Sequence, residues 1–262
     1  FGTSQQGQLY RTLNGGQSLS NISEPGAGSG NWVTPWEQDP VESITSYLGY
    51  SIVYKTSNGG NSWTPVSQNF GANLDHIKIS QSDNQTIYAA RSTKFYRTQD
   101  AGATDWEEMT NPGGSIRSIA IHPTIPEKVA VATSSSNKVY VSLDGGATWT
   151  DYKFNLPNFN SLALVWDDNG EDGLYLGMDY GIFYIDNTFA DWQPYNTNLP
   201  NVIINELEIN NLDGKIYAGT YGRGVWASPI VPSVLSTESF LSTKDVILYP
   251  NPTNDKITLS FN

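Results

Sequence analysis

The sequence contains no cysteine, which excludes disulfide bonds, thiolate metal sites and a cysteine nucleophile. It has only two histidines, His76 and His122, and their wide separation does not match the spacing of histidine metal ligands. Basic residues are scarce as well, because 14 lysines and arginines face 26 acidic residues and give a formal net charge of -12. Such a chain repels a phosphate backbone. We therefore expect no metal site, no cofactor and no nucleic-acid partner.

Long apolar runs are also missing. No stretch approaches the roughly 18 consecutive apolar residues that a membrane-spanning helix needs, so we expect no membrane span. The chain has instead 24 glycines, 12% aromatic residues and many short segments in which apolar and polar residues alternate. This composition is typical of an all-β domain with many turns.

A repeated turn motif gives the chain its period. Four tryptophans recur at intervals of 43 residues: Trp63, Trp106, Trp149 and Trp192. The clearest copy of the motif reads SLDGGATW and ends at Trp149. Its glycines accept the positive φ that a tight hairpin needs, and its aspartate or asparagine can accept hydrogen bonds from the turn amides. These acceptors are Asn14, Asn58, Asp100, Asp144 and Asp186.

Self-similarity at a period of roughly 40 to 50 residues, with strand-rich units, is typical of propellers. The motif resembles the Asp-box repeat of β-propellers, S/T-x-D/N-x-G-x-x-W, which occurs in sialidases, sortilin-type receptors and many secreted glycosidases. In that family the Asp-box lies at a peripheral hairpin far from the active site. The resemblance therefore implies a structural role for the repeated asparagines, aspartates and tryptophans. If Trp149 is a buried anchor, its removal costs about 3–5 kcal/mol.

The strands between the motifs repeat in groups of four, which predicts an all-β propeller with four-stranded blades. About five and a half blades are visible, because the first lacks its inner strand and the last lacks its outer strand. We therefore expect a fragment of a larger protein, with the propeller over residues 1–230. The expected inner strands of the second to fifth blades are Trp32–Trp36, His76–Ile79, Ile116–Ile121 and Ser161–Trp166.

Propellers of this family meet ligands on one face, formed by the loops that lead into the inner strands and by the turns between second and third strands. Residues expected on that face are Trp36, Asp75, Arg91, Arg117, Asp179, Tyr180, Tyr221 and Arg223, with Tyr50 close by. Aromatic rings there could stack on a sugar or a protein ligand. The alternative is that these residues are solvated or plug the channel.

The sequence assigns no catalytic residue. A sialidase would need a cluster of arginines, but the chain has only five and lacks an Arg-Ile-Pro motif. A xyloglucanase-type glycosidase needs two carboxylates roughly 5 to 9.5 Å apart, and nothing in the context of Asp75 and Asp179 marks such a pair. We favour a non-catalytic propeller that binds glycans or proteins or acts as a scaffold. The alternative is a secreted glycoside hydrolase whose catalytic residues lie partly outside this sequence.

One acidic run could suggest a calcium site. Asp167–Asp172 reads DDNGED, and hard cations bind clustered oxygen atoms. Its glycine does not stand where the EF-hand loop requires one. We therefore expect a solvated turn rather than a metal site.

The repeat ends after Pro229, and the composition of residues 231–243 predicts a linker. The next segment, Tyr249, Pro250, Asn251 and Pro252 followed by an alternating strand over Lys256–Phe261, resembles the opening of the type IX secretion sorting domain of Bacteroidetes, a small β-sandwich. This resemblance assigns residues 244–262 to the start of that domain. It implies that the type IX machinery is a partner of the C-terminal segment, and that the protein is secreted or held at the cell surface.

Overall fold

The computed structural model describes residues 1–22, 25–26, 28–232, 246–249 and 258–261. Within these ranges the elements are strands, apart from a short 3-10 helix, η1 (Gln5–Gly7). None of the described residues form a helix long and apolar enough to cross a membrane. The prediction of an all-β fold is confirmed.

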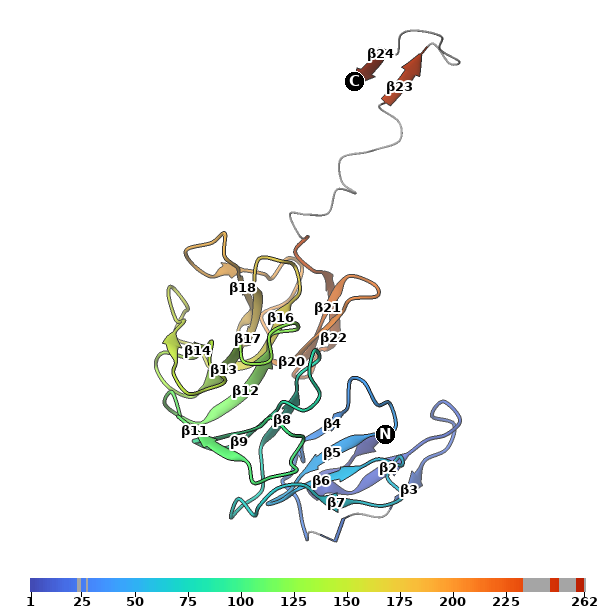
Figure 1. The fold of residues 1–262 in the computed structure, drawn as a ribbon. Coiled ribbons are helices and arrows are strands. Elements are labelled where there is room, and N and C mark those ends of the chain that lie inside the picture. Colours follow the sequence, from blue (N-terminus) through green and yellow to red (C-terminus); the bar gives the residue numbers. More distant parts are fainter. Residues whose placement is uncertain (23–24, 27, 233–245, 250–257, 262) are drawn as a thin grey trace.

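Six small antiparallel sheets follow one another along residues 1–230 (Figure 1). Inner strands of five of these sheets line one cavity. The strands of each sheet pair in chain order. Four sheets have four strands, whereas the first and last have three. This is the arrangement of β-propeller blades, and the shorter first and last blades match the strand count that the repeat predicted.

The first blade contains β1 (Gly2–Thr3), β2 (Leu9–Arg11) and β3 (Ser20–Asn21). The second contains β4 (Trp36–Gln38), β5 (Ser46–Gly49), β6 (Val53–Thr56) and β7 (Thr64–Pro65). The third contains β8 (His76–Ile79), β9 (Ile87–Arg91), β10 (Lys94–Thr98) and β11 (Glu107–Met109).

The fourth blade contains β12 (Ile116–Ile121), β13 (Val129–Thr133), β14 (Val139–Ser142) and β15 (Thr150–Asp151). The fifth contains β16 (Ser161–Asp167), β17 (Gly173–Met178), β18 (Gly181–Ile185) and β19 (Gln193–Pro194). The sixth contains β20 (Ile204–Asn210), β21 (Lys215–Thr220) and β22 (Gly224–Pro229).

The inner strands β8 and β12 have the predicted bounds, but the prediction for β4 was wrong. We expected Trp32–Trp36, whereas the strand runs over Trp36–Gln38. The residues before it form a loop, in which the Thr34 hydroxyl donates a hydrogen bond to the Asn31 carbonyl oxygen at 2.9 Å. Pro35 also has no amide hydrogen to give to a sheet. Strand pairing therefore starts four residues later than alternation alone suggested.

The Asp-box turns are closed by side-chain hydrogen bonds. In the clearest copy, the Ser142 hydroxyl accepts a bond from Gly146 N at 2.8 Å and donates one to Asp144 Oδ1 at 2.7 Å. Asp144 also accepts bonds from the hydroxyl and amide of Thr148, at 2.6 and 2.9 Å. These bonds, that of the Thr148 hydroxyl foremost, lower the pKa of Asp144 to about 2. Related bonds surround Asn14, Asn58, Asp100 and Asp186.

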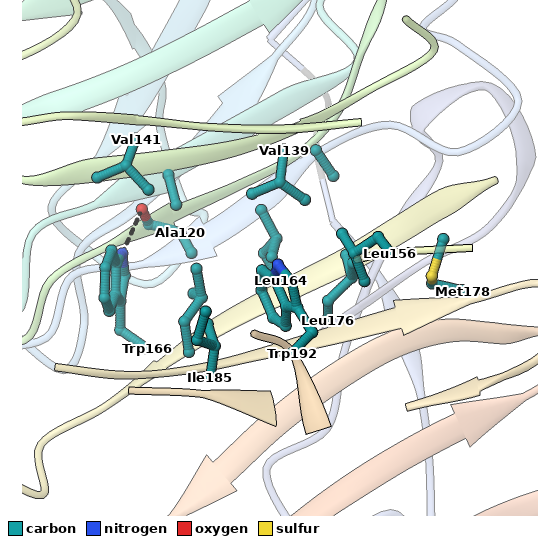
Figure 2. Packing of buried hydrophobic residues seen from close by; sticks show 13 residues of the cluster. Ala120, Val139, Val141, Leu156, Leu164, Trp166, Leu176, Met178, Ile185 and Trp192 are labelled. Carbon is teal, nitrogen blue, oxygen red and sulfur yellow. Dashed lines mark hydrogen bonds between the residues drawn. The ribbon is translucent and has the colours of Figure 1, made fainter. Parts of the chain in front are cut away.

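Each of three Asp-box tryptophans binds the blade before its own. The indole Nε1 donates to a main-chain carbonyl oxygen at the end of that blade's outer strand: Trp106 to Val66 at 2.8 Å, Trp149 to Thr110 at 2.8 Å and Trp192 to Tyr152 at 2.9 Å. The repeated turn therefore serves as a joint between neighbouring blades. Figure 2 shows Trp192 in the apolar cluster between the fourth and fifth blades.

The three tryptophans are not equally buried. Trp106 and Trp192 are 3% and 1% exposed, but Trp149 is only half-buried, so our premise that Trp149 is a buried anchor was wrong. The main chain of Trp192 exchanges two hydrogen bonds with the Asn155 side chain, at 2.9 and 3.1 Å. The amide in the corresponding loop before Trp149, that of Asn111, instead accepts a bond from Gly113 N. Trp149 therefore lacks the clamp that draws Trp192 inward.

Two further strands, β23 (Val246–Tyr249) and β24 (Thr258–Phe261), pair antiparallel with each other. Tyr249 is the last residue of β23, whereas Pro250, Asn251, Pro252 and most of the predicted linker lie outside the described residues. The assignment of residues 231–262 to a linker and the start of a sorting domain stays a prediction.

Candidate functional site

A cavity of about 710 Å³ opens at the end of the propeller where the inner strands begin. We call this end the front face. The cavity is lined by residues of five inner strands (β4, β8, β12, β16 and β20), by the loop before β4, by Asp75 just before β8 and by Thr3 of β1. Its volume lies in the range of roughly 300–1,000 Å³ that is common for ligand pockets.

β-Bulges in the inner strands determine the positions of three of the lining residues. The register shifts between Ile116 and Ser118 in β12, and equivalent shifts occur in β16 and β20. The residues at these β-bulges are Arg117, Leu162 and Asn205, and all three line the cavity. A bulge re-aims the side chain that it carries. A cation, an apolar group and an amide are thereby brought to one cavity from three blades.

The loop before β4 presents apolar groups at the cavity rim. Trp32 and Val33 both line the cavity, and they are 71% and 76% exposed. Their loop is tied to the next blade, because Asn31 Nδ2 donates to Leu74 O at 3.0 Å and to Asp75 Oδ1 at 2.8 Å. An exposed indole on a fixed loop gives up little conformational entropy when it meets a ligand.

Charged side chains meet deeper in the channel. Lys78 Nζ lies 2.6 Å from Glu37 Oε1 and 4.0 Å from Glu208 Oε1. Burial lowers the pKa of Lys78, but the carboxylates of Glu37, Glu208 and Glu206 together raise it more, so the pKa lies above its ordinary value. Burial raises the pKa of Glu37 despite this ion pair. Loss of water also raises the pKa of Glu206, as does repulsion by Glu208.

His76 borders this cluster and lines the cavity. Burial lowers its pKa, so the ring is neutral at pH 7. The channel therefore carries more negative than positive charge around Lys78, while the exposed Arg117 stands at the mouth.

The structure brings three of the eight predicted ligand-face residues into the cavity wall: Trp36, Asp75 and Arg117. The other five lie outside its lining, on β9 and on the turns after β17 and β21: Arg91, Asp179, Tyr180, Tyr221 and Arg223. Tyr180 and Tyr221 are exposed there, and Tyr180 stacks on Phe159 with ring centroids 5.3 Å apart. The Arg91 guanidinium donates to the Phe70 carbonyl oxygen.

The two aspartates considered for catalysis tie loops together. Asp75 Oδ2 accepts a hydrogen bond from Ser92 N at 2.8 Å. Asp179 Oδ2 accepts one from Asn160 Nδ2 at 2.7 Å. In each case the bond joins the loop before an inner strand to the turn after the second strand of the same blade. These carboxylates do not share a cavity, because only Asp75 lines it.

Tyr50 lies in the turn after β5, as expected, but it is buried rather than exposed. Its hydroxyl donates to the Gly7 carbonyl oxygen at 2.9 Å, which joins the second blade to the first. Trp36 is only partly available to a ligand. It lines the cavity, but its ring centroid lies 5.7 Å from that of Phe1 and its Nε1 is buried.

The acidic run at residues 167–172 is not the solvated turn that we expected. Asp167 is 2% exposed and Asn169 is also buried. Asp172 forms an ion pair with Lys128 and lies 3.1 Å from His122 Nε2, both in the fourth blade. The turn therefore packs between blades. Among the described residues no three His, Asp or Glu side chains are grouped so that they could hold a metal ion.

Several cavity residues were missed by sequence reasoning: Glu37, Lys78, Leu162, Asn205 and Glu206. The error in β4 hid Glu37, because it placed that residue beyond the strand. The sequence could have shown that Leu162 and Asn205 occupy equivalent positions, since they lie one 43-residue period apart. No sequence pattern predicts the β-bulges that turn both side chains toward the cavity.

Comparison with known proteins supports the fold. The Sortilin-Vps10 family (Sortilin, neurotensin receptor 3) matches residues 51–153. A xyloglucanase of Hypocrea jecorina (strain QM6a) is 25% identical over 191 residues, which cover 68% of this chain and 23% of that protein. The structure of YCF48 bound to D1 peptide is similar with a TM-score of 0.65 at 15% identity, covering 86% of this chain and 74% of that one.

The GH74 enzyme of Niastella koreensis is similar with a TM-score of 0.59 at 16% identity, covering 81% of this chain and 33% of that one. The chain thus spans about a quarter of the xyloglucanase and a third of the GH74 enzyme. The blades, the repeat and the matched region together identify the described part of residues 1–232 as a β-propeller with sortilin-like Asp-box repeats.

Proposed function

We propose that this propeller is a glycan-binding module and that the front-face cavity is its binding site. The observation that carries the proposal is Trp32, an exposed indole on the rim of the cavity. Exposing an indole to water is unfavourable, and its flat apolar face suits the face of a sugar ring. The sequence similarity to a xyloglucanase makes xyloglucan the first ligand to test.

The rim loop is fixed on both of its sides. Gly30 N donates to Gln6 O of the first blade at 2.9 Å, and Asn31 Nδ2 binds Leu74 O of the stretch before the third blade's inner strand. A sugar ring that stacks on Trp32 therefore meets a surface already in place. Binding then costs little loop ordering.

Polar groups around the indole can orient the sugar. Arg117 and Asn205 are exposed and line the same cavity. A guanidinium donates hydrogen bonds, and an amide both donates and accepts them, so the two side chains match the hydroxyl groups of a glycan.

Two of the three carboxyl groups that line the cavity, those of Asp75 and Glu37, already have partners within the fold, which favours binding over hydrolysis. Asp75 accepts hydrogen bonds from Asn31 and Ser92, and Glu37 forms an ion pair with Lys78. A glycosidase needs one carboxyl group that donates a proton and a second one across the bond to be cleaved. Carboxylates that already serve as acceptors within the fold are poorly suited to either task.

The proposal predicts that the full chain binds a xyloglucan oligosaccharide and that Trp32→Ala weakens this binding about tenfold, or about 1.4 kcal/mol. Isothermal titration calorimetry measures both affinities. Leu212→Ala is the matched control, since Leu212 is an exposed apolar residue in the turn between β20 and β21, away from the front face. Equal affinities for the Trp32→Ala variant and the wild type would refute the assignment of the site.

A second candidate function is that of a glycoside hydrolase, which the similarity to a xyloglucanase supports. Its catalytic residues would lie partly outside this sequence. Release of reducing ends from xyloglucan by the protein, abolished by a single carboxylate substitution, would favour this candidate over the binding module.

We also propose that the protein is exported by the type IX secretion machinery. Support comes from the stretch Tyr249 to Pro252, which lies mostly outside the described residues. Deletion of residues 232–262 is expected to leave the propeller folded but held in the periplasm of a host with this machinery, because the deletion removes the segment that resembles the sorting domain. Cell fractionation with immunoblotting checks the result. Delivery of the truncated protein to the surface would rule out this route.

A further inference from the structure

Two exposed aromatic side chains stack on each other on the front face of the fifth blade. Phe159 lies in the loop before β16 and Tyr180 in the turn after β17, and their ring centroids are 5.3 Å apart with an interplanar angle of 22°. They remain 40% and 47% exposed although each covers part of the other. The inner strand of this blade contacts those of the fourth and sixth blades on its two sides. The two rings therefore offer a flat apolar surface within the ring of blades.

A carboxylate holds the two aromatic residues together. Asp179 Oδ2 accepts hydrogen bonds from Asn160 N at 3.1 Å and from Asn160 Nδ2 at 2.7 Å, and Asp179 N donates to Asn160 O at 3.1 Å. Phe159 precedes Asn160 and Tyr180 follows Asp179 in the chain, so these bonds fix the main chain beside both rings. A surface that is already in place loses little conformational entropy when it binds a ligand. Asp179 is thus a positioning residue for the pair.

The fourth blade closes the same junction without aromatic residues. There Ser115 N donates to Ser134 Oγ at 2.8 Å, and Ser134 N donates to Ser115 O at 2.9 Å. The residues beside these two, Gly114 and Ser135, occupy the places of the aromatic pair. A Cβ atom at Gly114 would lie 2.7 Å from Ser135 N, so this junction has no room for a large side chain. The blade fold therefore does not need a stacked pair at this position.

The pair is continuous with the front-face cavity. The loop that carries the first ring leads into β16, whose Leu162 lines the cavity. The turn that carries the second ring is tied to the sixth blade, because Gly181 N donates to Val202 O at 3.3 Å, and the strand that follows, β20, contributes Asn205 to the same cavity. Trp32 lines the cavity from the loop before β4. A ligand in the cavity can therefore meet aromatic surfaces on two blades.

We propose that the Phe159–Tyr180 pair, held in place by Asp179, is a second glycan-stacking surface that binds sugar residues extending out of the cavity. This inference rests on the proposed function of the cavity. The exposed neighbours of the rings, Asn158 and Asn160, carry amides that can bond to sugar hydroxyl groups. The core of a protein interface is more apolar than this surface. The pair therefore suits an extended glycan chain better than a protein.

Isothermal titration calorimetry with the full chain, a short xyloglucan oligosaccharide and one of about twice its length tests the proposal. We expect the longer oligosaccharide to bind the wild type about tenfold more tightly than the short one, because its additional sugar residues reach the pair. Tyr180→Ala should abolish this advantage and leave the affinity for the short oligosaccharide unchanged, which also shows that the variant is folded.

Phe189→Ala is the matched control. Phe189 is 42% exposed and belongs to the same blade, but it lies in the Asp-box turn between β18 and β19, at the opposite end of the propeller. This variant should keep the full advantage of the longer oligosaccharide.

Substitutions of Asp179 test its positioning role. Asp179→Ala removes the acceptor of both Asn160 bonds and should reduce the advantage about threefold, whereas Asp179→Asn keeps an acceptor oxygen and should retain most of it. The proposal is overturned if the longer oligosaccharide binds the wild type no more tightly than the short one, or if Tyr180→Ala keeps the advantage. In both cases binding of the short oligosaccharide at Trp32 would leave the proposed function intact, whereas failure of the short oligosaccharide to bind would contradict that function itself.

Discussion

Replacing Trp192 by alanine is expected to lower the free energy of unfolding by about 3–5 kcal/mol, because the change empties a buried site and removes its contacts. Trp192 is 1% exposed and packs in the cluster between the fourth and fifth blades. The variant also loses the indole hydrogen bond to the Tyr152 carbonyl oxygen and leaves that acceptor unpaired. Urea denaturation followed by far-ultraviolet circular dichroism measures the loss.

Trp149→Ala is the matched control for this prediction. The two residues occupy the same place in the repeat and donate equivalent hydrogen bonds, but Trp149 is half-buried and has no amide clamp on its main chain. We expect a loss of about 2 kcal/mol for Trp149→Ala, since less apolar surface is exposed. Equal losses for both variants would show that burial at the blade joint does not decide the stability.

Replacing Asp167 by asparagine is expected to stabilise the protein at pH 7 by up to about 3 kcal/mol. Asp167 is 2% exposed, and its Oδ2 has no hydrogen-bond partner among the described residues. Burial, followed by repulsion from Asp168, raises the pKa of Asp167 to about 6. Ionising this carboxyl group therefore costs more in the folded protein than in the unfolded chain.

The sign of the pH dependence follows from this shift. Between about pH 4 and pH 6 the folded protein binds more protons at Asp167 than the unfolded chain does, so the contribution of this group to stability falls as the pH rises. The gain from Asp167→Asn should therefore be small at pH 4 and full at pH 7. Asp168→Asn, at an exposed neighbour, should give a much smaller gain. A gain for Asp167→Asn that does not change with pH would contradict this account.

The fold was largely predictable because residues close together in the sequence determine its turns. Gly145 and Gly146 both have positive φ, and Asp144 closes the turn that they make. A motif that satisfies its own hydrogen bonds can be recognised without tertiary information. The bounds of β4 were not predictable in this way, since Trp32 and Val33 are residue types common in strands although both are exposed in a loop.

The candidate site was less predictable because it depends on several blades at once. Arg117 was found as a charged residue at the start of an inner strand, but the turn of Leu162 and Asn205 into the same cavity depends on bulges that the sequence does not mark. The partner of Lys78 is Glu37 of the second blade, and only the packing of the neighbouring inner strands β4 and β8 brings them together. Tyr50 is a residue type common in binding sites, but its hydroxyl binds the Gly7 carbonyl oxygen and so joins two blades.

The central claim, that the front-face cavity is a glycan-binding site, is tested most directly by a crystal structure of the full chain soaked with a xyloglucan oligosaccharide. The account predicts electron density for a sugar ring stacked on Trp32, with hydroxyl groups within hydrogen-bond distance of Arg117 and Asn205. An oligosaccharide bound elsewhere on the propeller, or an empty cavity at a saturating concentration, would contradict it.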